Sequence, residues 1–285
     1  MTPPEVFAYR NPGSPPDTPG WNLRVVPNKY PALVNQGDGT ASKDGVYESM
    51  AGLGVHEVII ESPDHVVNVE ALSERQFAAV LRAYRERMLE LRKDNRWRSI
   101  LIYKNQGASA GATLEHVHSQ LVALAAVPKE ILEEIVGARK FYESNGRCIY
   151  CEMIRRETDG GERLVAGHER WVALCPYAAR FPFETWIMPK AHAPYFERSS
   201  DQDLADLTHC LRDALARLNR VLDHPPFNYL IHSNPWDGAE TRHYHWHIEI
   251  FPKLVQVAGF EWGSGMFINP VAPEDTARLL RQVAL

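Results

Sequence analysis

The sequence is poor in cysteine, in long hydrophobic runs and in excess positive charge. Four cysteines in 285 residues are too few for a disulfide framework, which excludes the small disulfide-rich secreted scaffolds. No apolar stretch approaches the roughly 18 residues that a membrane span needs. The 31 Lys and Arg residues are outnumbered by 36 Asp and Glu residues, and the net charge of −5 argues against a nucleic-acid-binding protein.

The first twenty residues are polar and rich in proline, and they contain no apolar segment of the kind that secretory signals carry. We therefore expect a cytoplasmic protein without a membrane anchor. With 45% hydrophobic and 24% charged residues, the composition is ordinary for a globular chain. The length fits one large domain or two of ordinary size.

The two halves of the chain follow the same order of predicted elements. A buried strand ends at His65, a helix follows over residues 69–94, and a strand, a Gly/Ala/Ser loop and the strand HVHSQLVAL complete the first half. The second half repeats this order from His192, with a helix over 199–224, the strand FNYLIHSNP, a polar loop at 236–242 and the strand HYHWHIEIF. His65 and His118 are 53 residues apart, as are His192 and His245. We infer a duplicated α+β unit.

The stretch EHVHSQLVAL places His116, His118 and Gln120 on one face of a predicted strand, because residues two apart point the same way. A polar face of a half-buried strand would give the same pattern. The second half carries a similar row at His243, His245 and His247, which favours a functional site. A neutral imidazole is a competent nucleophile near neutral pH.

The loop before this strand, GASAGAT, carries Gly107, Ser109, Gly111 and Thr113. Backbone N–H groups and hydroxyls of such loops bind phosphates, although many Gly/Ala/Ser loops are only connectors. On the neighbouring strand, Gln120 would offer its side-chain amide to a phosphoryl oxygen.

Cys148 and Cys151 form a CxxC pair that predicts a zinc site when histidines complete it. A redox or packing role remains an alternative for a single CxxC. His192 and either His243 or His245 would supply the other two ligands. The first half has His65 and His116 but no CxxC, so a first zinc site would be incomplete. The two remaining cysteines, Cys175 and Cys210, lie in apolar surroundings and are expected to be packing residues.

The chain resembles the family of galactose-1-phosphate uridylyltransferase and ADP-glucose phosphorylase, in the histidine triad superfamily. The resemblance covers nearly the whole chain and rests on four motifs in order: GWNLRVVPNKYPAL, NQGASAGATLEHVHSQ, FPFETWIMPKAH and GFEWGSGMFINPVAPED. The HVHSQ form, with no proline between the histidines, is closer to the ADP-glucose phosphorylase branch.

The resemblance implies an α+β fold, namely a duplicated histidine-triad-like fold with helices packed on an antiparallel sheet. Its two pseudo-repeats would span residues 1–130, with the nucleophile, and residues 131–285, with the zinc site. It also implies a ping-pong nucleotidyltransferase of carbohydrate metabolism, in which His118 attacks a nucleotide sugar and the nucleotide then passes to a sugar 1-phosphate. Homodimers are common in the family, so we expect one here.

The family's functional positions transfer to this sequence as further expectations. Asn28 and Asn105 match nucleotide contacts, and His116 matches a position that binds zinc or supports the nucleophile. Lys253 and Asn269 would lie near the sugar phosphate. For the zinc site, the resemblance favours His245, whereas the internal repeat pairs His116 with His243. The repeat places His245 where the nucleophile would be in the second half, so we expect one active site per chain.

Two alternatives remain open at the level of sequence. Phosphate or water replaces the sugar 1-phosphate as acceptor in a phosphorylase or a hydrolase of nucleotide sugars. A non-catalytic, zinc-stabilised binding protein would also keep the fold. The base, uridine or adenosine, and the hexose are not specified by these motifs.

Overall fold

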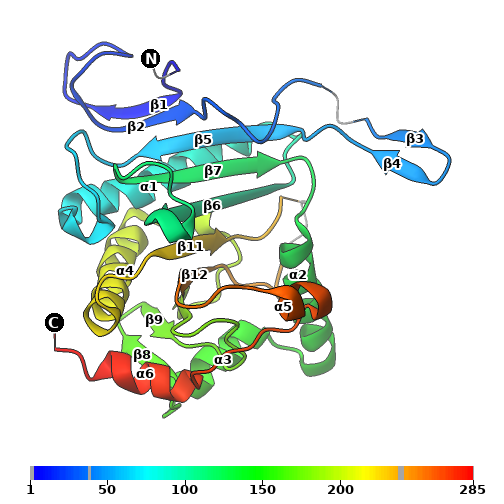
Figure 1. Ribbon diagram of the computed structural model, residues 1–285, viewed down its shortest axis with the longest axis vertical. Coiled ribbons are helices and arrows are strands. Elements are labelled where there is room, and N and C mark those ends of the chain that lie inside the picture. Colours follow the sequence, from blue (N-terminus) through cyan, green and yellow to red (C-terminus); the bar gives the residue numbers. More distant parts are fainter. Residues whose placement is uncertain (1–2, 38–39, 237–240, 285) are drawn as a thin grey trace.

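One ten-stranded antiparallel sheet dominates the computed structural model, which describes residues 3–37, 40–236 and 241–284 (Figure 1). In spatial order its strands are β1 (Phe7–Arg10), β2 (Trp21–Pro27), β5 (Gly54–Ile60), β7 (His118–Leu124), β6 (Ser99–Gln106), β11 (Phe227–His232), β12 (His247–Pro252), β10 (Thr185–Pro189), β9 (Trp171–Leu174) and β8 (Leu164–Gly167). A separate hairpin, β3 (Ser42–Asp44) and β4 (Tyr47–Ser49), extends away from the rest of the chain (Figure 1). The loop predicted at 236–242 falls partly outside the described residues.

The sheet contains the predicted duplication. The order β5-β7-β6 in the first half is mirrored by β10-β12-β11 in the second, and β6 pairs with β11 at the centre. The α+β fold class with an antiparallel sheet is confirmed. The division into units at 1–130 and 131–285 stays a prediction, because the sheet runs continuously from one half into the other.

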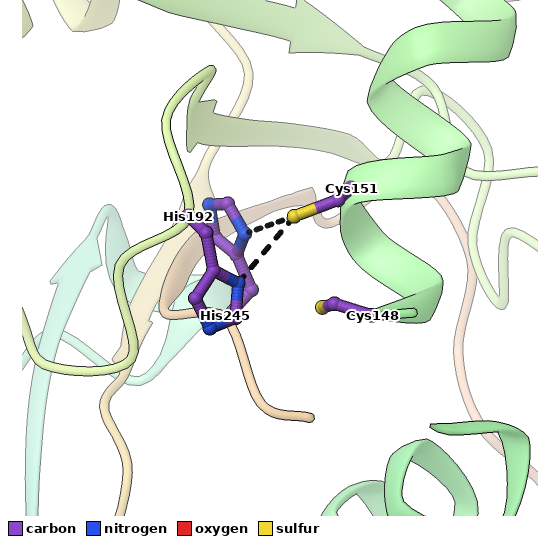
Figure 2. Close-up of side chains that lie close together, drawn as sticks. All are labelled: Cys148, Cys151, His192 and His245. Atoms are coloured by element: carbon purple, nitrogen blue, oxygen red, sulfur yellow. Dashed lines mark hydrogen bonds between the residues drawn. The ribbon is translucent and has the colours of Figure 1, made fainter. Parts of the chain in front are cut away.

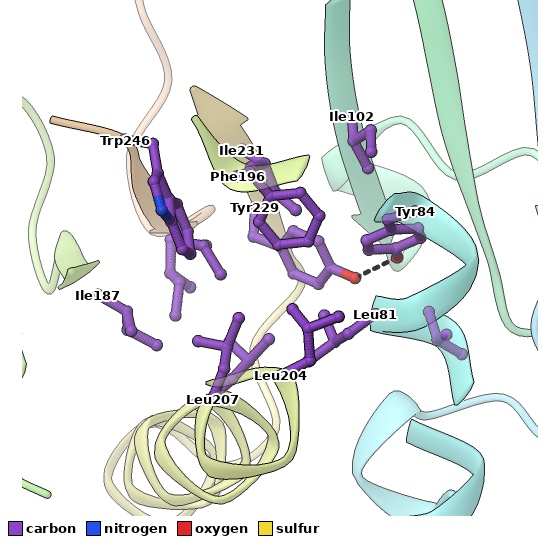
Figure 3. Close-up of a cluster of buried hydrophobic side chains, with 14 of the residues drawn as sticks. Leu81, Tyr84, Ile102, Ile187, Phe196, Leu204, Leu207, Tyr229, Ile231 and Trp246 are labelled. Atoms are coloured by element: carbon purple, nitrogen blue, oxygen red, sulfur yellow. Dashed lines mark hydrogen bonds between the residues drawn. The ribbon is translucent and has the colours of Figure 1, made fainter. Parts of the chain in front are cut away.

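Helices α1 (Glu74–Leu91) and α4 (Asp201–Leu222) contact each other and pack on the same face of the sheet (Figure 1). Both begin at a serine cap: Ser73 accepts a hydrogen bond from the Gln76 amide, and Ser200 forms a capping box with Asp203. Their apolar sides meet strand residues and Trp246 in the main core (Figure 3). Cys175 and Cys210 belong to this core, as predicted.

The opposite face of the sheet is covered mainly in the second half. Helices α2 (Lys129–Asn145) and α3 (Ile149–Thr158) form a second apolar cluster with Val172, Leu174 and Met188, whose neighbours along the strands belong to the main core. Every residue of β12 is therefore buried, whereas β7 alternates between buried and half-buried residues. The face of β7 that carries Gln120 is left accessible, which places the candidate site in the first half.

Three short helical turns and two further helices complete the described chain. They are η1 (Val69–Ala71), η2 (Ala108–Ala110), η3 (Phe196–Arg198), α5 (Gly259–Ser264) and α6 (Pro273–Arg281). No helix of the described part combines the length and apolarity that crossing a bilayer requires.

Candidate active site

His118 is the first residue of β7, and its side chain is held in one tautomer. Its Nδ1–H donates to the backbone carbonyl of His116 at 2.8 Å, because a carbonyl can only accept. The lone pair is therefore on Nε2. His118 is 9% exposed, and burial lowers the pKa of its imidazole, so the neutral form is favoured. The geometry presents an unprotonated nitrogen with the properties of a nucleophile.

Gln120, two residues further along β7, is fixed through its carbonyl oxygen. The backbone N–H of Ala32 donates to Nδ1 of His56 at 3.2 Å, so His56 carries its proton on Nε2 and donates it to Gln120 Oε1 at 2.8 Å. The hydroxyl of Tyr103 donates to the same oxygen at 3.0 Å. With its oxygen occupied, Gln120 presents its NH₂ group as a donor.

Two hollows adjoin His118 and share the lining residues Thr113, Leu114 and His116. The larger, of about 620 Å³, is also lined by Asn28 and Gln120. The smaller, of about 360 Å³, is also lined by Asn105 and Gly107. His118 therefore lies where both hollows meet, under the loop that sequence predicted to bind phosphate.

Asn105, one of the two predicted nucleotide contacts, lies at the end of β6 and is joined to this loop by a residue that sequence reasoning missed. Asn228 of β11 donates through Nδ2 to Asn105 Oδ1 at 2.7 Å and to the carbonyl of Ala110 at 2.8 Å. Gly111 has φ +88°, and a Cβ there would lie 3.4 Å from Asn105 Nδ2. A glycine thus lets the loop turn close to Asn105. The pairing of β6 with β11 supplies Asn228, and no local motif signals it.

The first-half histidines do not form a complete metal site. His116 donates from Nε2 to the carbonyl of Ser62 at 2.8 Å, and its ring meets His65 edge-on with centroids 5.6 Å apart. Within the described ranges, no third Cys, His, Asp or Glu joins these two in a potential metal-binding group. His116 instead supports His118 through its backbone carbonyl.

The second-half site assembles the four predicted zinc ligands (Figure 2). The ligand atoms of Cys148, Cys151, His192 and His245 lie within 4.8 Å of one another. Cys151 Sγ is 3.4 Å from His192 Nδ1 and 3.6 Å from His245 Nδ1. His245 donates from Nε2 to the carbonyl of Pro189 at 2.9 Å, which leaves Nδ1 free to bind a metal.

One thiol of this cluster, that of Cys148, favours the charged state. Cys151 and the two histidines beside Cys148 lower the pKa of its thiol far below the usual value, while the neighbouring Cys148 raises the pKa of Cys151. The pair thus shares a proton that a cation would displace, and thiolate is the form that binds zinc. The two sulfurs and two imidazole nitrogens match a closed tetrahedral zinc site.

Comparison with known proteins decides the family. The profile described as galactose-1-phosphate uridyl transferase, N-terminal domain, matches residues 20–128, and the profile for the C-terminal domain matches residues 134–270. The chain belongs to the galactose-1-phosphate uridylyltransferase family. The resemblance inferred from the motifs is confirmed.

Two similar proteins, and a crystal structure of one of them, show how far the likeness extends. An ADP-glucose phosphorylase of Arabidopsis thaliana is 36% identical, over 99% of this chain and 79% of its own. A galactose-1-phosphate uridylyltransferase of Thermotoga maritima is 31% identical, over 92% of this chain and 85% of its own. A crystal structure of the Arabidopsis ADP-glucose phosphorylase with bound ADP-glucose has a TM-score of 0.88 at 34% identity, covering 100% of this chain and 88% of that one.

In this uridylyltransferase family member, the structure matches the histidines of the two halves differently from the sequence spacing. His247 begins β12 and donates from Nδ1 to the carbonyl of His245 at 3.1 Å, as His118 at the start of β7 does to His116. His247, not His245, therefore occupies the position of the nucleophile. The equal 53-residue intervals were misleading because the loop before β12 is longer.

His247 belongs to a second buried group of potential metal ligands that the motifs did not reveal. Glu134, His232 and Glu249 are the other members, all within 4.8 Å. His232 donates from Nδ1 to Glu134 at 3.0 Å, and this carboxylate raises the pKa of His232 to about 9 against the effect of its burial. Arg180 bonds Glu249 at 2.6 Å. In the structure these charges balance one another. The signal missed in the sequence is Glu249, the acidic residue that follows HWHI.

Asn269 lies outside both hollows at His118. It donates from Nδ2 to the carbonyls of Ala179 at 3.2 Å and Phe181 at 3.3 Å, and so attaches the C-terminal segment to the loop before β10. Lys253 also lines neither hollow; its ammonium lies 5.7 Å from the centre of the Phe181 ring. The expected place of both residues beside the sugar phosphate is therefore not found within one chain.

Proposed function

We propose that this protein is a nucleotidyltransferase that moves a nucleoside monophosphate from a nucleotide sugar to a phosphate acceptor by a ping-pong mechanism. The observation that carries the proposal is the fixed tautomer of His118, with its Nε2 lone pair at the junction of two hollows. Membership in the galactose-1-phosphate uridylyltransferase family supports the same reaction class.

In the first step, Nε2 of His118 attacks the α-phosphorus, a P–N bond forms, and the P–O bond to the sugar 1-phosphate breaks. The imidazole enters the step neutral because burial lowers its pKa. Gln120 donates its NH₂ to a nonbridging oxygen and so stabilises the charge on the phosphoryl group. In the second step an acceptor phosphate oxygen attacks phosphorus and releases His118.

The identity of the acceptor distinguishes a uridylyltransferase from a phosphorylase or a hydrolase. A sugar 1-phosphate acceptor gives a uridylyltransferase, inorganic phosphate gives an ADP-glucose phosphorylase, and water gives a hydrolase. The phosphorylase reading is favoured by the HVHSQ motif and by the similarity to the Arabidopsis ADP-glucose phosphorylase.

Product analysis tests the proposal and the choice of acceptor. UDP-glucose with galactose 1-phosphate should yield UDP-galactose if the protein is a uridylyltransferase, whereas ADP-glucose with phosphate should yield ADP and glucose 1-phosphate if it is a phosphorylase. Failure to transfer a nucleotide in both mixtures contradicts the proposal. A non-catalytic binding protein would give that result, and its function would survive His118→Ala.

We also propose that Cys148, Cys151, His192 and His245 hold one Zn²⁺ with a structural role. Zinc supplies a tetrahedral crosslink with no open position for substrate. Here the four ligands come from α3, the turn after β10 and the segment before β12. A bound zinc ion would therefore hold α3, near the start of the second half, against the sheet.

We also propose a homodimer, which the segment after β12 supports. Phe260, Trp262, Met266 and Ile268 are exposed apolar residues close together in sequence, and Trp262 is 80% exposed. Apolar patches of this kind mark protein interfaces. A second copy of the chain would cover them. A cytoplasmic location fits the four free thiols.

A further inference from the structure

Strand β6 separates from β7 near His118, the first residue of β7. Backbone pairing of β6 with β7 ends at Tyr103 and Gln120, and β6 continues beside β11 alone. The Glu61 N–H donates to the carbonyl of Val117 across β5 and β7, so the next carbonyl, that of His118, points to the β6 side. This carbonyl lies just where the ladder to β6 has stopped.

The side chain of Lys104 takes the place of the missing ladder bond. Its ammonium donates to the His118 carbonyl at 2.8 Å and to Glu61 Oε2 at 2.7 Å. Lys104 is 1% exposed and Glu61 0% exposed. The cation therefore joins the end of β5 to the first residue of β7 across the gap between two strands.

The same buried network holds the residue after the nucleophile. The hydroxyl of Tyr84 lies 2.7 Å from Ser119 Oγ and 3.2 Å from the second oxygen of Glu61. It is also 2.6 Å from the hydroxyl of Tyr229 on β11 (Figure 3). Backbone and side-chain atoms at the start of β7 are thus fixed from α1, β6 and β11 together.

A buried ion pair is a weak way to stabilise a sheet. Removing two charges from water costs several kcal/mol per ion, and apolar residues of similar size are often as stable or more stable. The contact of Lys104 with His118 gives the pair another role. An error of about 1 Å in the position of a reacting group can slow a reaction roughly 100-fold.

We propose that Lys104 is a positioning residue for the nucleophile. Its ammonium, anchored by Glu61, fixes the backbone of His118 where β6 and β7 separate, and so directs Nε2 to the α-phosphorus. The inference rests on the proposed function of His118 and adds a residue pair to its machinery. Lys104 borders the smaller hollow, but its ammonium is bonded to Glu61 and to the His118 carbonyl, so the effect reaches the reaction through His118.

The test removes both charges at once and compares the result with a matched ion pair. Lys104→Met with Glu61→Leu replaces the pair by apolar side chains. The control, Arg87→Met with Glu57→Leu, removes another buried ion pair close by, between α1 and β5, with Arg87 and Glu57 2.7 Å apart. Thermal unfolding, the Kd for ADP-glucose and UDP-glucose, and the single-turnover rate of nucleotidyl-His118 formation are measured for both.

We expect the Lys104/Glu61 variant to form the adduct roughly 100-fold more slowly at saturating nucleotide sugar, with Kd within about 2-fold of the wild type. The control should keep the wild-type rate. This split between rate and binding distinguishes positioning from a general loss of packing.

Three results overturn the inference. The first is an unchanged rate in the Lys104/Glu61 variant. The second is an equal loss in the control. The third is a wild type that forms no adduct, which overturns the proposed function as well and is thereby told apart from the first two. If the apolar variant unfolds, Lys104→Gln with Glu61→Gln, which keeps polar side chains without charge, decides by the same readout.

Discussion

At the scale of single residues, the two ring nitrogens of His118 account for the proposed nucleophilic attack. Nδ1 of His118 is committed to the His116 carbonyl, which leaves Nε2 as the only nitrogen able to attack phosphorus. The sequence predicted His118 and Gln120, because period-two spacing along one strand is visible in it. It did not predict His56, Tyr103 or Lys104, since strand pairing, not local spacing, brings these residues to β7.

The pKa of His118 gives a prediction on pH. Burial disfavours the imidazolium and lowers the pKa below its ordinary value of 6.5, so the neutral nucleophile persists into mildly acidic solution. Adduct formation should therefore be constant from about pH 8 downward and fall only below about pH 6.5. Single-turnover rates across this range measure the midpoint. A midpoint above 6.5 contradicts the account.

Gln120 gives a prediction on transition-state charge. Gln120→Ala removes a donor that is held in place by His56 and Tyr103, and loss of one such donor commonly costs about 100-fold in kcat. We expect that loss with a smaller change in KM, measured by steady-state kinetics with the preferred nucleotide sugar. A kcat within about 2-fold of the wild type would show that Gln120 does not contact the phosphoryl group.

At the scale of elements, α2 and α3 make the two halves of the sheet different. They bury the face of β12 and leave that of β7 accessible, so one half has an open cleft and the other a closed cluster of ligands. The sequence predicted the repeated elements from their periodicity and caps. It misjudged the register of the second half, because equal intervals between histidines hide loops of different length.

Loss of the zinc site should destabilise the elements that it joins. We expect one Zn²⁺ per chain by metal analysis, and we expect Cys151→Ser or His245→Ala to remove it. The unfolding temperature should then fall by about 10 °C, as a loss of about 4 kcal/mol would in a chain of this size. His243→Ala is the matched control and should keep the metal. If His243→Ala loses the zinc and His245→Ala keeps it, the ligand assignment is wrong.

At the scale of the whole molecule, several exposed apolar residues lie close together in the segment around α5. Sequence motifs marked this segment as belonging to the family, but exposure depends on how the C-terminal segment crosses the surface, which local patterns do not specify. Asn269 illustrates this, since its side chain attaches the segment to the loop at Ala179 and Phe181.

A dimer through this segment should be sensitive to one charge. Trp262→Glu places a carboxylate in the proposed interface and should convert a dimer into a monomer of 32.3 kDa, measured by light scattering after size-exclusion chromatography. Tyr177→Glu, at another exposed aromatic residue, is the control and should remain a dimer. A wild-type monomer, or a variant that stays dimeric, contradicts this interface.

The central claim is that His118 carries the nucleotide between two substrates. Intact mass spectrometry after mixing the protein with ADP-glucose, UDP-glucose or UDP-galactose, in the absence of acceptor, tests it most directly. We predict a mass increase equal to one nucleotidyl group, absent in His118→Ala, and the increment names the base. The claim is contradicted if zinc-replete wild type forms no adduct with any of the three, or if His118→Ala forms it equally well.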